Sequence, residues 1–204
     1  MLSLLDMSPV VPVVVLDDAA QAVPLANALV RGGVRIIEVT LRTPAALESI
    51  RRIAAEVPDA VVGAGTVVTP AQALAVKEAG ARFIVTPGST DAVLDAAAST
   101  GLPVLPGAAT VTEVLRLAER GYRELKFFPA EAAGGIPFLK SIAGPIPDIR
   151  FCPTGGITAT TAPAYLALPN VGCVGGSWLT ASTDLATVER LAGQASALRA
   201  NTTA

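Results

Sequence analysis

Short runs of Val, Ile and Leu alternate with longer Ala- and Leu-rich segments along almost the whole chain. Strands that are covered on both faces are continuously apolar, so the short runs indicate a buried parallel sheet and the longer segments indicate helices. The strands are predicted at Val10–Val15, Arg35–Thr40, Ala60–Gly65, Arg82–Val85, Pro103–Leu105, Glu124–Phe128, Arg150–Pro153 and Gly172–Val174. The helices are predicted at Asp18–Arg31, Pro44–Glu56, Pro70–Ala79, Asp91–Ser99, Thr112–Arg120, Pro137–Ile142, Thr160–Leu168 and Leu185–Leu198.

Boundary residues support these helices. Thr43 and Thr69 each precede a proline, which is the order of an N-cap residue followed by proline at the first helical position. Glycines that suit helix C-termini follow four of the predicted helices, at Gly32-Gly33, Gly80, Gly101 and Gly121.

Eight strand–helix units predict an α/β fold, a compact (β/α)8 TIM barrel that forms a single domain over residues 1–204. We expect a short N-terminal helix before the first strand and a flexible tail at residues 200–204. A doubly wound open sheet is the structural alternative, although no G-x-G-x-x-G follows the first strand. In a barrel, functional side chains lie where the strands end, and the polar residues and glycines of this chain gather there.

Composition and charge narrow the possible functions. Hydrophobic residues make up 51% of the chain, but none of the apolar runs approaches the roughly 20 residues of a membrane span. The N-terminus lacks a signal-peptide pattern, and a net charge of −2 argues against nucleic acid as a partner, so we expect a cytoplasmic protein. Cys152 and Cys173 lie in apolar runs and are expected to be buried thiols in a reducing compartment.

The chain contains no histidine. Its absence removes the Ser-His-Asp and Cys-His arrangements, ligation of a metal by histidine, and any histidine general base. Acid–base chemistry would have to come from Glu, Asp, Lys, Tyr or water, and no cluster of carboxylates suggests a metal site.

Lys126 interrupts the apolar run Glu124-Leu-Lys-Phe-Phe-Pro129. Burial disfavours the charged ammonium, and a neutral amine is a nucleophile that forms a Schiff base with a carbonyl compound. The other two lysines, Lys77 and Lys140, fall at ordinary helix-surface positions. The alternative for Lys126 is a lysine that extends from the strand end into water.

Glu38 interrupts the apolar strand Arg-Ile-Ile-Glu-Val-Thr-Leu in the same way, and it is a candidate general base. A structural ion pair with Arg42 or Lys126 is the alternative. Arg42 could bind a carboxylate with two hydrogen bonds, and Thr66 could donate to the same carboxylate. Arg42 could equally be a surface residue at the start of a helix, and Thr66 a turn residue.

Glycine pairs follow the last two predicted strands, at Gly155-Gly156 and at Gly175-Gly176-Ser177. Barrels often bind phosphate through backbone N–H groups of these two loops, where glycine allows a close approach. Together with Lys126, Arg42 and Thr66, these loops suggest an α-keto acid substrate that carries a distal phosphate.

In these motifs the chain resembles the 2-keto-3-deoxy-6-phosphogluconate (KDPG) aldolases, the Schiff-base aldolases of the Entner–Doudoroff pathway. The resemblance rests on PVVPVVV, GGVRIIEVTLRT, VVGAGTV, ELKFFPAEAAGG, RFCPTGGI and VGGSWL, in this order. It implies a homotrimeric barrel without a cofactor, which cleaves a phosphorylated keto acid to pyruvate and glyceraldehyde 3-phosphate and also acts on 4-hydroxy-2-oxoglutarate.

The same resemblance implies a role for each site residue. Lys126 would be the Schiff-base lysine and Glu38 the acid–base residue, without a metal ion. The implied substrate contacts are Arg42 and Thr66 for the carboxylate, Phe128 as a wall, Thr154 as a specificity residue of the gluconate type, and Gly155, Gly156, Gly176 and Ser177 for the phosphate. The sequence leaves two alternatives: a phosphosugar isomerase or epimerase on the same barrel, and a non-catalytic trimeric scaffold.

Overall fold

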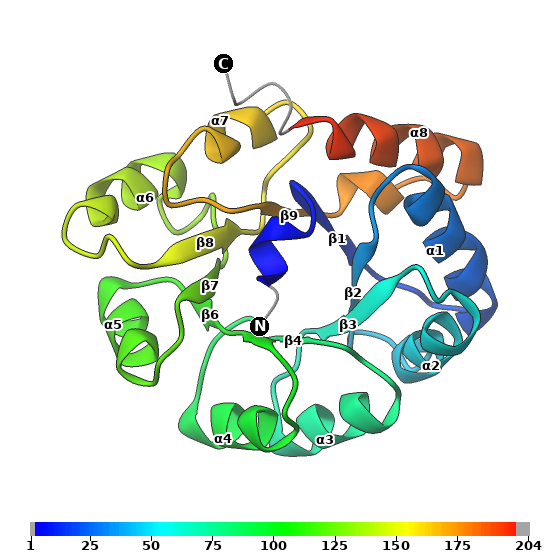
Figure 1. Ribbon diagram of the computed structural model, residues 1–204, viewed down its shortest axis with the longest axis horizontal. Coiled ribbons are helices and arrows are strands. Elements are labelled where there is room, and N and C mark those ends of the chain that lie inside the picture. Colours follow the sequence, from blue (N-terminus) through cyan, green and yellow to red (C-terminus); the bar gives the residue numbers. More distant parts are fainter. Residues whose placement is uncertain (1–2, 199–204) are drawn as a thin grey trace.

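The computed structural model describes residues 3–198, and it forms the predicted (β/α)8 barrel, with the helices arranged around a ring of parallel strands (Figure 1). The prediction of the fold class is therefore confirmed. The strands are β1 (Val10–Val14), β2 (Ile36–Thr40), β3 (Val61–Gly65), β4 (Ile84–Val85), β5 (Val104–Leu105), β6 (Gly107–Ala108), β7 (Glu124–Phe127), β8 (Arg150–Pro153) and β9 (Val174–Gly176).

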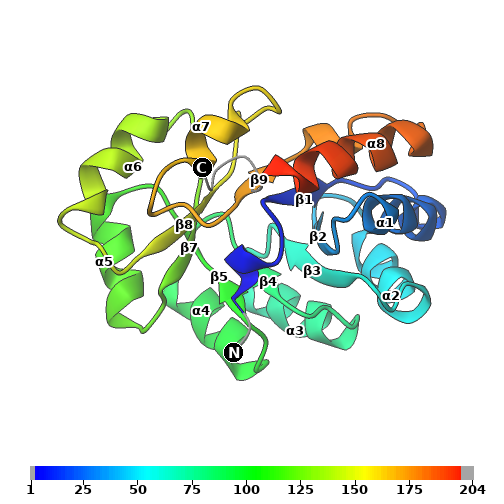
Figure 2. The same ribbon diagram turned by 45° about the horizontal axis from the view of Figure 1, so that its top comes forward.

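Eight α-helices follow these strands on the outside of the ring within the described part of the chain (Figure 2). They are α1 (Ala22–Arg31), α2 (Ala46–Glu56), α3 (Pro70–Glu78), α4 (Asp91–Ser99), α5 (Val111–Glu119), α6 (Gly135–Ala143), α7 (Ala162–Leu166) and α8 (Leu185–Ser196). Short 3-10 turns lie at η1 (Leu4–Asp6), η2 (Ala19–Gln21) and η3 (Trp178–Thr180). None of the helices in residues 3–198 has both the length and the apolar character needed to cross a membrane.

The ring has eight positions because β5 and β6 together fill one of them. Strands β5-β4-β3-β2-β1-β9 form one parallel sheet and β6-β7-β8 form another. Pro106 lies between β5 and β6 and has no N–H to give to a ladder, yet its carbonyl oxygen accepts from the Lys126 N–H at 2.9 Å. The pairs Phe151–Val171 and Thr154–Gly175 join β8 to the β9 side and close the ring.

Two separate apolar cores follow from the alternation of side chains along each strand. Ile37 and Val39 point outward and pack in the large core beneath the helices. Ile36 points inward and belongs to a smaller core that fills the start of the barrel interior. The other buried members of this smaller core are Leu4, Leu5, Val11, Phe83, Val85, Leu105, Cys152 and Cys173. Both cysteines are buried, as the sequence predicted, and neither forms a disulfide within residues 3–198.

The N-terminal segment closes the end of the barrel where the strands begin. It lies across the centre of the ring in Figures 1 and 2, and its Leu4 and Leu5 pack into the inner core. The Leu4 N–H donates to the Glu124 carboxylate at 3.2 Å, and Arg150 donates to Asp6. The predicted N-terminal helix is thus a single 3-10 turn, and the predicted tail at residues 200–204 lies outside the described residues.

Several predicted element boundaries are wrong by one or more residues. Thr69 caps α3 as expected, and its hydroxyl accepts from the Gln72 N–H at 3.2 Å. Thr43 does not cap a helix, because its hydroxyl donates to the Leu16 carbonyl oxygen, and α2 begins only at Ala46. The last strand begins two residues later than predicted, at Val174, because its register pairs Val174 with Val10.

Candidate active site

Lys126 and Glu38 meet inside the barrel. Lys126 on β7 donates a hydrogen bond from Nζ to Glu38 Oε1 on β2 at 3.1 Å, and their side chains are only 4% and 3% exposed. Three strand positions separate β2 from β7 in either direction around the ring, so the two side chains span the interior. The alternative of a lysine that extends into water is therefore wrong, whereas Lys77 and Lys140 are exposed on helices as predicted.

Glycine makes room for this pair. A β-carbon at Gly65 would overlap the Glu38 carboxylate, and one at Gly107 would overlap the backbone of Pro87. Gly107 is also the direct strand neighbour of Lys126 on β6. The barrel interior can therefore hold the Glu38 carboxylate at this level because Gly65 has no side chain, whereas Gly107 lets β6 lie close to the backbone of Pro87.

Arg42 and Thr66 lie together at the ends of β2 and β3. Arg42 Nε donates to Thr66 Oγ1 at 3.2 Å, and Arg42 makes no ion pair with Glu38. The backbone of Thr66 has a φ of 58°, a left-handed conformation that is uncommon for a β-branched residue. A strained residue of this kind points to a functional constraint. The Thr66 hydroxyl and the Arg42 guanidinium lie within hydrogen-bonding distance of each other at this position.

A pocket of about 150 Å³ opens at the rim where the strands end. Its lining includes seven of the eight predicted substrate contacts: Arg42, Phe128, Thr154, Gly155, Gly156, Gly176 and Ser177. Thr66 joins them through its hydrogen bond with Arg42. The structure thus brings all eight predicted contacts to one side of the barrel.

Phe128 connects the buried pair with this pocket. Lys126 Nζ lies 5.5 Å from the centre of the Phe128 ring, and the same ring lines the pocket and packs against Gly155. A cation or an iminium at Lys126 would face the electron-rich ring.

The Gly155–Gly156 loop lines the pocket. Both glycines have positive φ, 102° and 81°, a backbone conformation that glycine adopts readily. Thr154 forms a parallel β-bridge with Gly175 just before the loop, whereas the Gly156 N–H donates to no backbone or side-chain acceptor within residues 3–198. Two hydrogen bonds hold the start of the loop against the segment after β7: the carbonyl oxygens of Thr154 and Gly155 accept from the N–H groups of Ala130 and Glu131.

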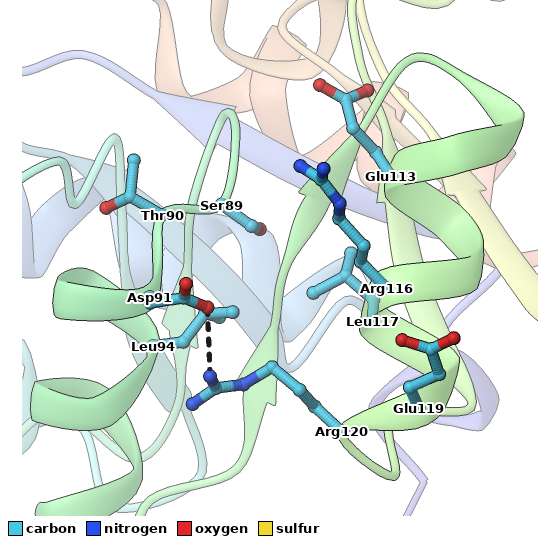
Figure 3. A pocket seen from close by; sticks show the side chains of 9 residues that line it. All are labelled: Ser89, Thr90, Asp91, Leu94, Glu113, Arg116, Leu117, Glu119 and Arg120. Atoms are coloured by element: carbon cyan, nitrogen blue, oxygen red, sulfur yellow. Dashed lines mark hydrogen bonds and ion pairs between the residues drawn. The ribbon is translucent and has the colours of Figure 1, made fainter.

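A larger groove of about 710 Å³ lies on the outside of the barrel between α4 and α5 (Figure 3). Arg120 crosses it to Asp91 at 3.0 Å, and Arg116, Glu113 and Glu119 line the facing helix. None of the predicted site residues lines this groove. Across residues 3–198, His, Cys, Asp and Glu side chains form no group of three or more that could hold a metal ion.

Comparison with known proteins identifies the family. The family model "KDPG and KHG aldolase" matches residues 1–191. A 2-dehydro-3-deoxy-phosphogluconate aldolase of Pseudoalteromonas atlantica is 55% identical to this chain over 84% of its length and 80% of the relative's. The chain belongs to the KDPG and KHG aldolase family.

Solved structures of family members agree with the fold. A KDPG aldolase of Legionella pneumophila, captured with pyruvate as a covalent carbinolamine, is 45% identical with a TM-score of 0.91, over 94% of this chain and 96% of that one. The enzyme of Zymomonas mobilis, solved with 3-phosphoglycerate, is 46% identical with a TM-score of 0.93, over 98% and 96% of the two chains. The resemblance seen in the sequence is thereby confirmed at the level of the family.

Sequence reasoning missed the residues that shape the site without lining it. Gly65 and Gly107 read as turn or strand-end glycines, and nothing in the local pattern reveals that a side chain from another strand fills the space beside Gly65. The alternation of inward and outward positions does indicate that Gly65 and Glu38 share the inner face of the barrel, because they lie at inward-facing positions of neighbouring strands.

The contact at Gly65 yields a prediction. Gly65→Ala places a methyl group where the Glu38 carboxylate lies, so we expect the free energy of unfolding to fall by about 1–3 kcal/mol. Gly88→Ala is the matched control, because a β-carbon at Gly88 would meet no atom within 4 Å. Urea denaturation measures both variants, and equal stabilities for the two would contradict the packing described here.

Proposed function

We propose that this chain is a metal-independent class I aldolase that cleaves 2-dehydro-3-deoxy-6-phosphogluconate to pyruvate and D-glyceraldehyde 3-phosphate. 4-Hydroxy-2-oxoglutarate is the second substrate. The observation that carries the proposal is the Lys126–Glu38 hydrogen bond of 3.1 Å in the barrel interior, next to a pocket lined by Arg42 and two glycine loops. Membership of the KDPG and KHG aldolase family supports the same reaction and both substrates.

A purely structural purpose explains the buried pair poorly. Removing two charges from water costs several kcal/mol per ion, and well-packed apolar residues of similar volume serve stability equally well. The pair instead joins a nucleophile to a base in one hydrogen bond. Transfer of the proton from Lys126 to Glu38 along this bond produces the neutral amine that the reaction requires.

Schiff-base formation begins the proposed reaction. The Lys126 amine attacks the C2 ketone to form a carbinolamine. Protonated Glu38 then donates its proton to the departing hydroxyl, which leaves as water, so that a protonated imine and the Glu38 carboxylate remain. The Legionella pneumophila relative was captured with pyruvate at the carbinolamine stage, which supports this step. The Phe128 ring, 5.5 Å from Lys126 Nζ, stabilises the positive charge of the imine.

Carbon–carbon cleavage follows from the imine. The Glu38 carboxylate removes the proton of the C4 hydroxyl, the C4–O bond becomes a carbonyl, and the C3–C4 bond breaks. Its electron pair moves through C3 and C2 to the imine nitrogen, so that an enamine of pyruvate remains on Lys126 and the aldehyde leaves. Glu38 returns its proton to C3, and addition of water to the imine then releases pyruvate and restores Lys126 and Glu38 to their starting state.

The remaining site residues orient the substrate. Arg42 and Thr66 hold the carboxylate beside the ketone, and their hydrogen bond of 3.2 Å aligns the two donors beforehand. The backbone of the Gly155–Gly156 loop, together with Gly176 and Ser177, receives the phosphate. Thr154 lies between these groups, on the pocket wall, where it contacts the middle of the substrate.

Covalent trapping tests the nucleophile. Borohydride added in the presence of pyruvate should reduce the imine and increase the mass of the peptide that contains Lys126. Lys126→Ala should abolish the adduct, whereas Lys140→Ala, which changes an exposed helical lysine, should leave it intact. An adduct on another lysine, or no adduct on the unaltered protein, would disprove the mechanism.

Glu38→Gln tests the base. The substitution keeps the size of the side chain and removes its ability to accept a proton, so kcat should fall about 100-fold or more. Steady-state kinetics on the phosphorylated substrate measure the effect, and Glu48→Gln on the exposed face of α2 is the matched control. An unchanged kcat for Glu38→Gln would assign the proton transfer to another group.

The assembly and location form a further part of the proposal. We expect each chain to act as a single-domain barrel, residues 1–204, within a cytoplasmic homotrimer, as the family resemblance implies. Sedimentation velocity should give a particle of three chains. A much larger particle would favour a role in assembly, and a monomer with full activity would show that the site needs no neighbour.

A further inference from the structure

Tyr165 on α7 is a buried side chain with one polar partner in the described part of the chain. The residue is 1% exposed and its hydroxyl donates to Glu131 Oε1 at 2.5 Å. Burial, and then the hydrogen bond to Glu131, raise the pKa of Tyr165 well above its usual value. The hydroxyl therefore stays protonated and remains a donor throughout the range in which an enzyme operates.

Glu131 links this hydroxyl to the Gly155–Gly156 loop. Its Cγ lies 2.6 Å from the place where a β-carbon of Gly156 would be, so the Glu131 side chain packs directly on that glycine. Its backbone N–H donates to the Gly155 carbonyl oxygen at 3.1 Å. Glu131 thus touches both glycines of the loop, one through its side chain and one through its backbone.

Gly135 completes the arrangement from the other side. A β-carbon at Gly135 would lie 2.8 Å from the Tyr165 hydroxyl, so only glycine lets the hydroxyl come so close to the start of α6. Tyr165 and Gly135 together fix the Glu131 side chain between α7 and the Gly155–Gly156 loop. None of the three residues lines the pocket itself.

We propose that Tyr165 and Glu131 are positioning residues that hold the Gly155–Gly156 loop in the conformation that binds the phosphate of the substrate. The inference rests on the proposed function, because it takes this loop as the phosphate site. Tyr165 acts through Glu131, and Glu131 acts through its contacts with Gly155 and Gly156. The carboxylate end of the substrate, near Arg42 and Thr66, lies outside this chain of contacts.

The two substrates of the proposed aldolase provide the test. Tyr165→Phe removes the hydroxyl alone, and we expect KM for the phosphorylated substrate to rise roughly three- to tenfold, the range for losing one hydrogen bond. Both kcat on that substrate and kcat/KM for the unphosphorylated 4-hydroxy-2-oxoglutarate should stay within twofold of their original values. The apparent inhibition constant of inorganic phosphate should rise in parallel with KM.

Tyr122→Phe is the matched control, because Tyr122 lies just before β7, at the opposite end of the barrel from the pocket, and its hydroxyl donates no hydrogen bond within residues 3–198. It should leave kcat and KM unchanged for both substrates.

Glu131→Ala changes an exposed residue and should raise KM for the phosphorylated substrate at least as much as Tyr165→Phe. The double variant should match Glu131→Ala alone, since both changes break the same chain of contacts.

The outcomes separate this inference from the proposed function. A KM that is unchanged in both single variants, or that rises equally for both substrates, overturns the positioning role while pyruvate trapping on Lys126 continues to support the aldolase. A protein that forms no pyruvate adduct and cleaves neither substrate overturns the proposed function itself. Thermal denaturation of each variant confirms that the comparison is made between folded proteins.

Discussion

The hydrogen bond between Lys126 and Glu38 across the barrel interior is the interaction on which the rest of the site depends. Two ionisable side chains from opposite strands occupy one level of a narrow interior, and Glu38 fits there because Gly65 has no side chain beside its carboxylate. Below this level, the inner core of aliphatic, aromatic and cysteine side chains excludes water and is closed by Leu4 and Leu5. The amine therefore faces one way, toward the pocket at the rim.

In the proposed function, the pocket binds the two ends of the substrate by different means. At the ends of β2 and β3, the side chains of Arg42 and Thr66 provide directional donors. At the ends of β8 and β9, the backbone of the glycine loops provides the donors, and a second layer of residues must hold that backbone in place. In the proposed arrangement Tyr165 and Glu131 form such a layer, whereas the surroundings of Thr66 hold its backbone in a left-handed conformation.

Much of this fold follows from local pattern. Apolar runs predict most strands to within one or two residues, because buried parallel strands leave a strong local signal. The cap at Thr69 is also a local signal, since the threonine directly precedes the proline that begins α3. Thr43 was misassigned because its hydroxyl bonds to Leu16, in a different loop, and the sequence does not reveal that contact. The division of the fifth strand at Pro106 likewise depends on pairing with Lys126.

The candidate site was predictable for a different reason. Lys126 and Glu38 contradict the apolar pattern of their strands, and such contradictions mark functional positions. Residues that agree with their surroundings leave no such mark: Tyr165 reads as an ordinary helical core residue, and Glu131 as a loop residue. Their relation becomes visible only when the loop after β7 and helix α7 are placed side by side.

A crystal structure of the protein soaked with pyruvate decides whether Lys126 is the nucleophile. It should show continuous electron density from Lys126 Nζ to C2 of pyruvate, with the pyruvate carboxylate against Arg42 and Thr66 and with Glu38 within hydrogen-bonding distance of the adduct. Pyruvate bound at a different place, with the Lys126–Glu38 hydrogen bond unbroken, would contradict this role of Lys126.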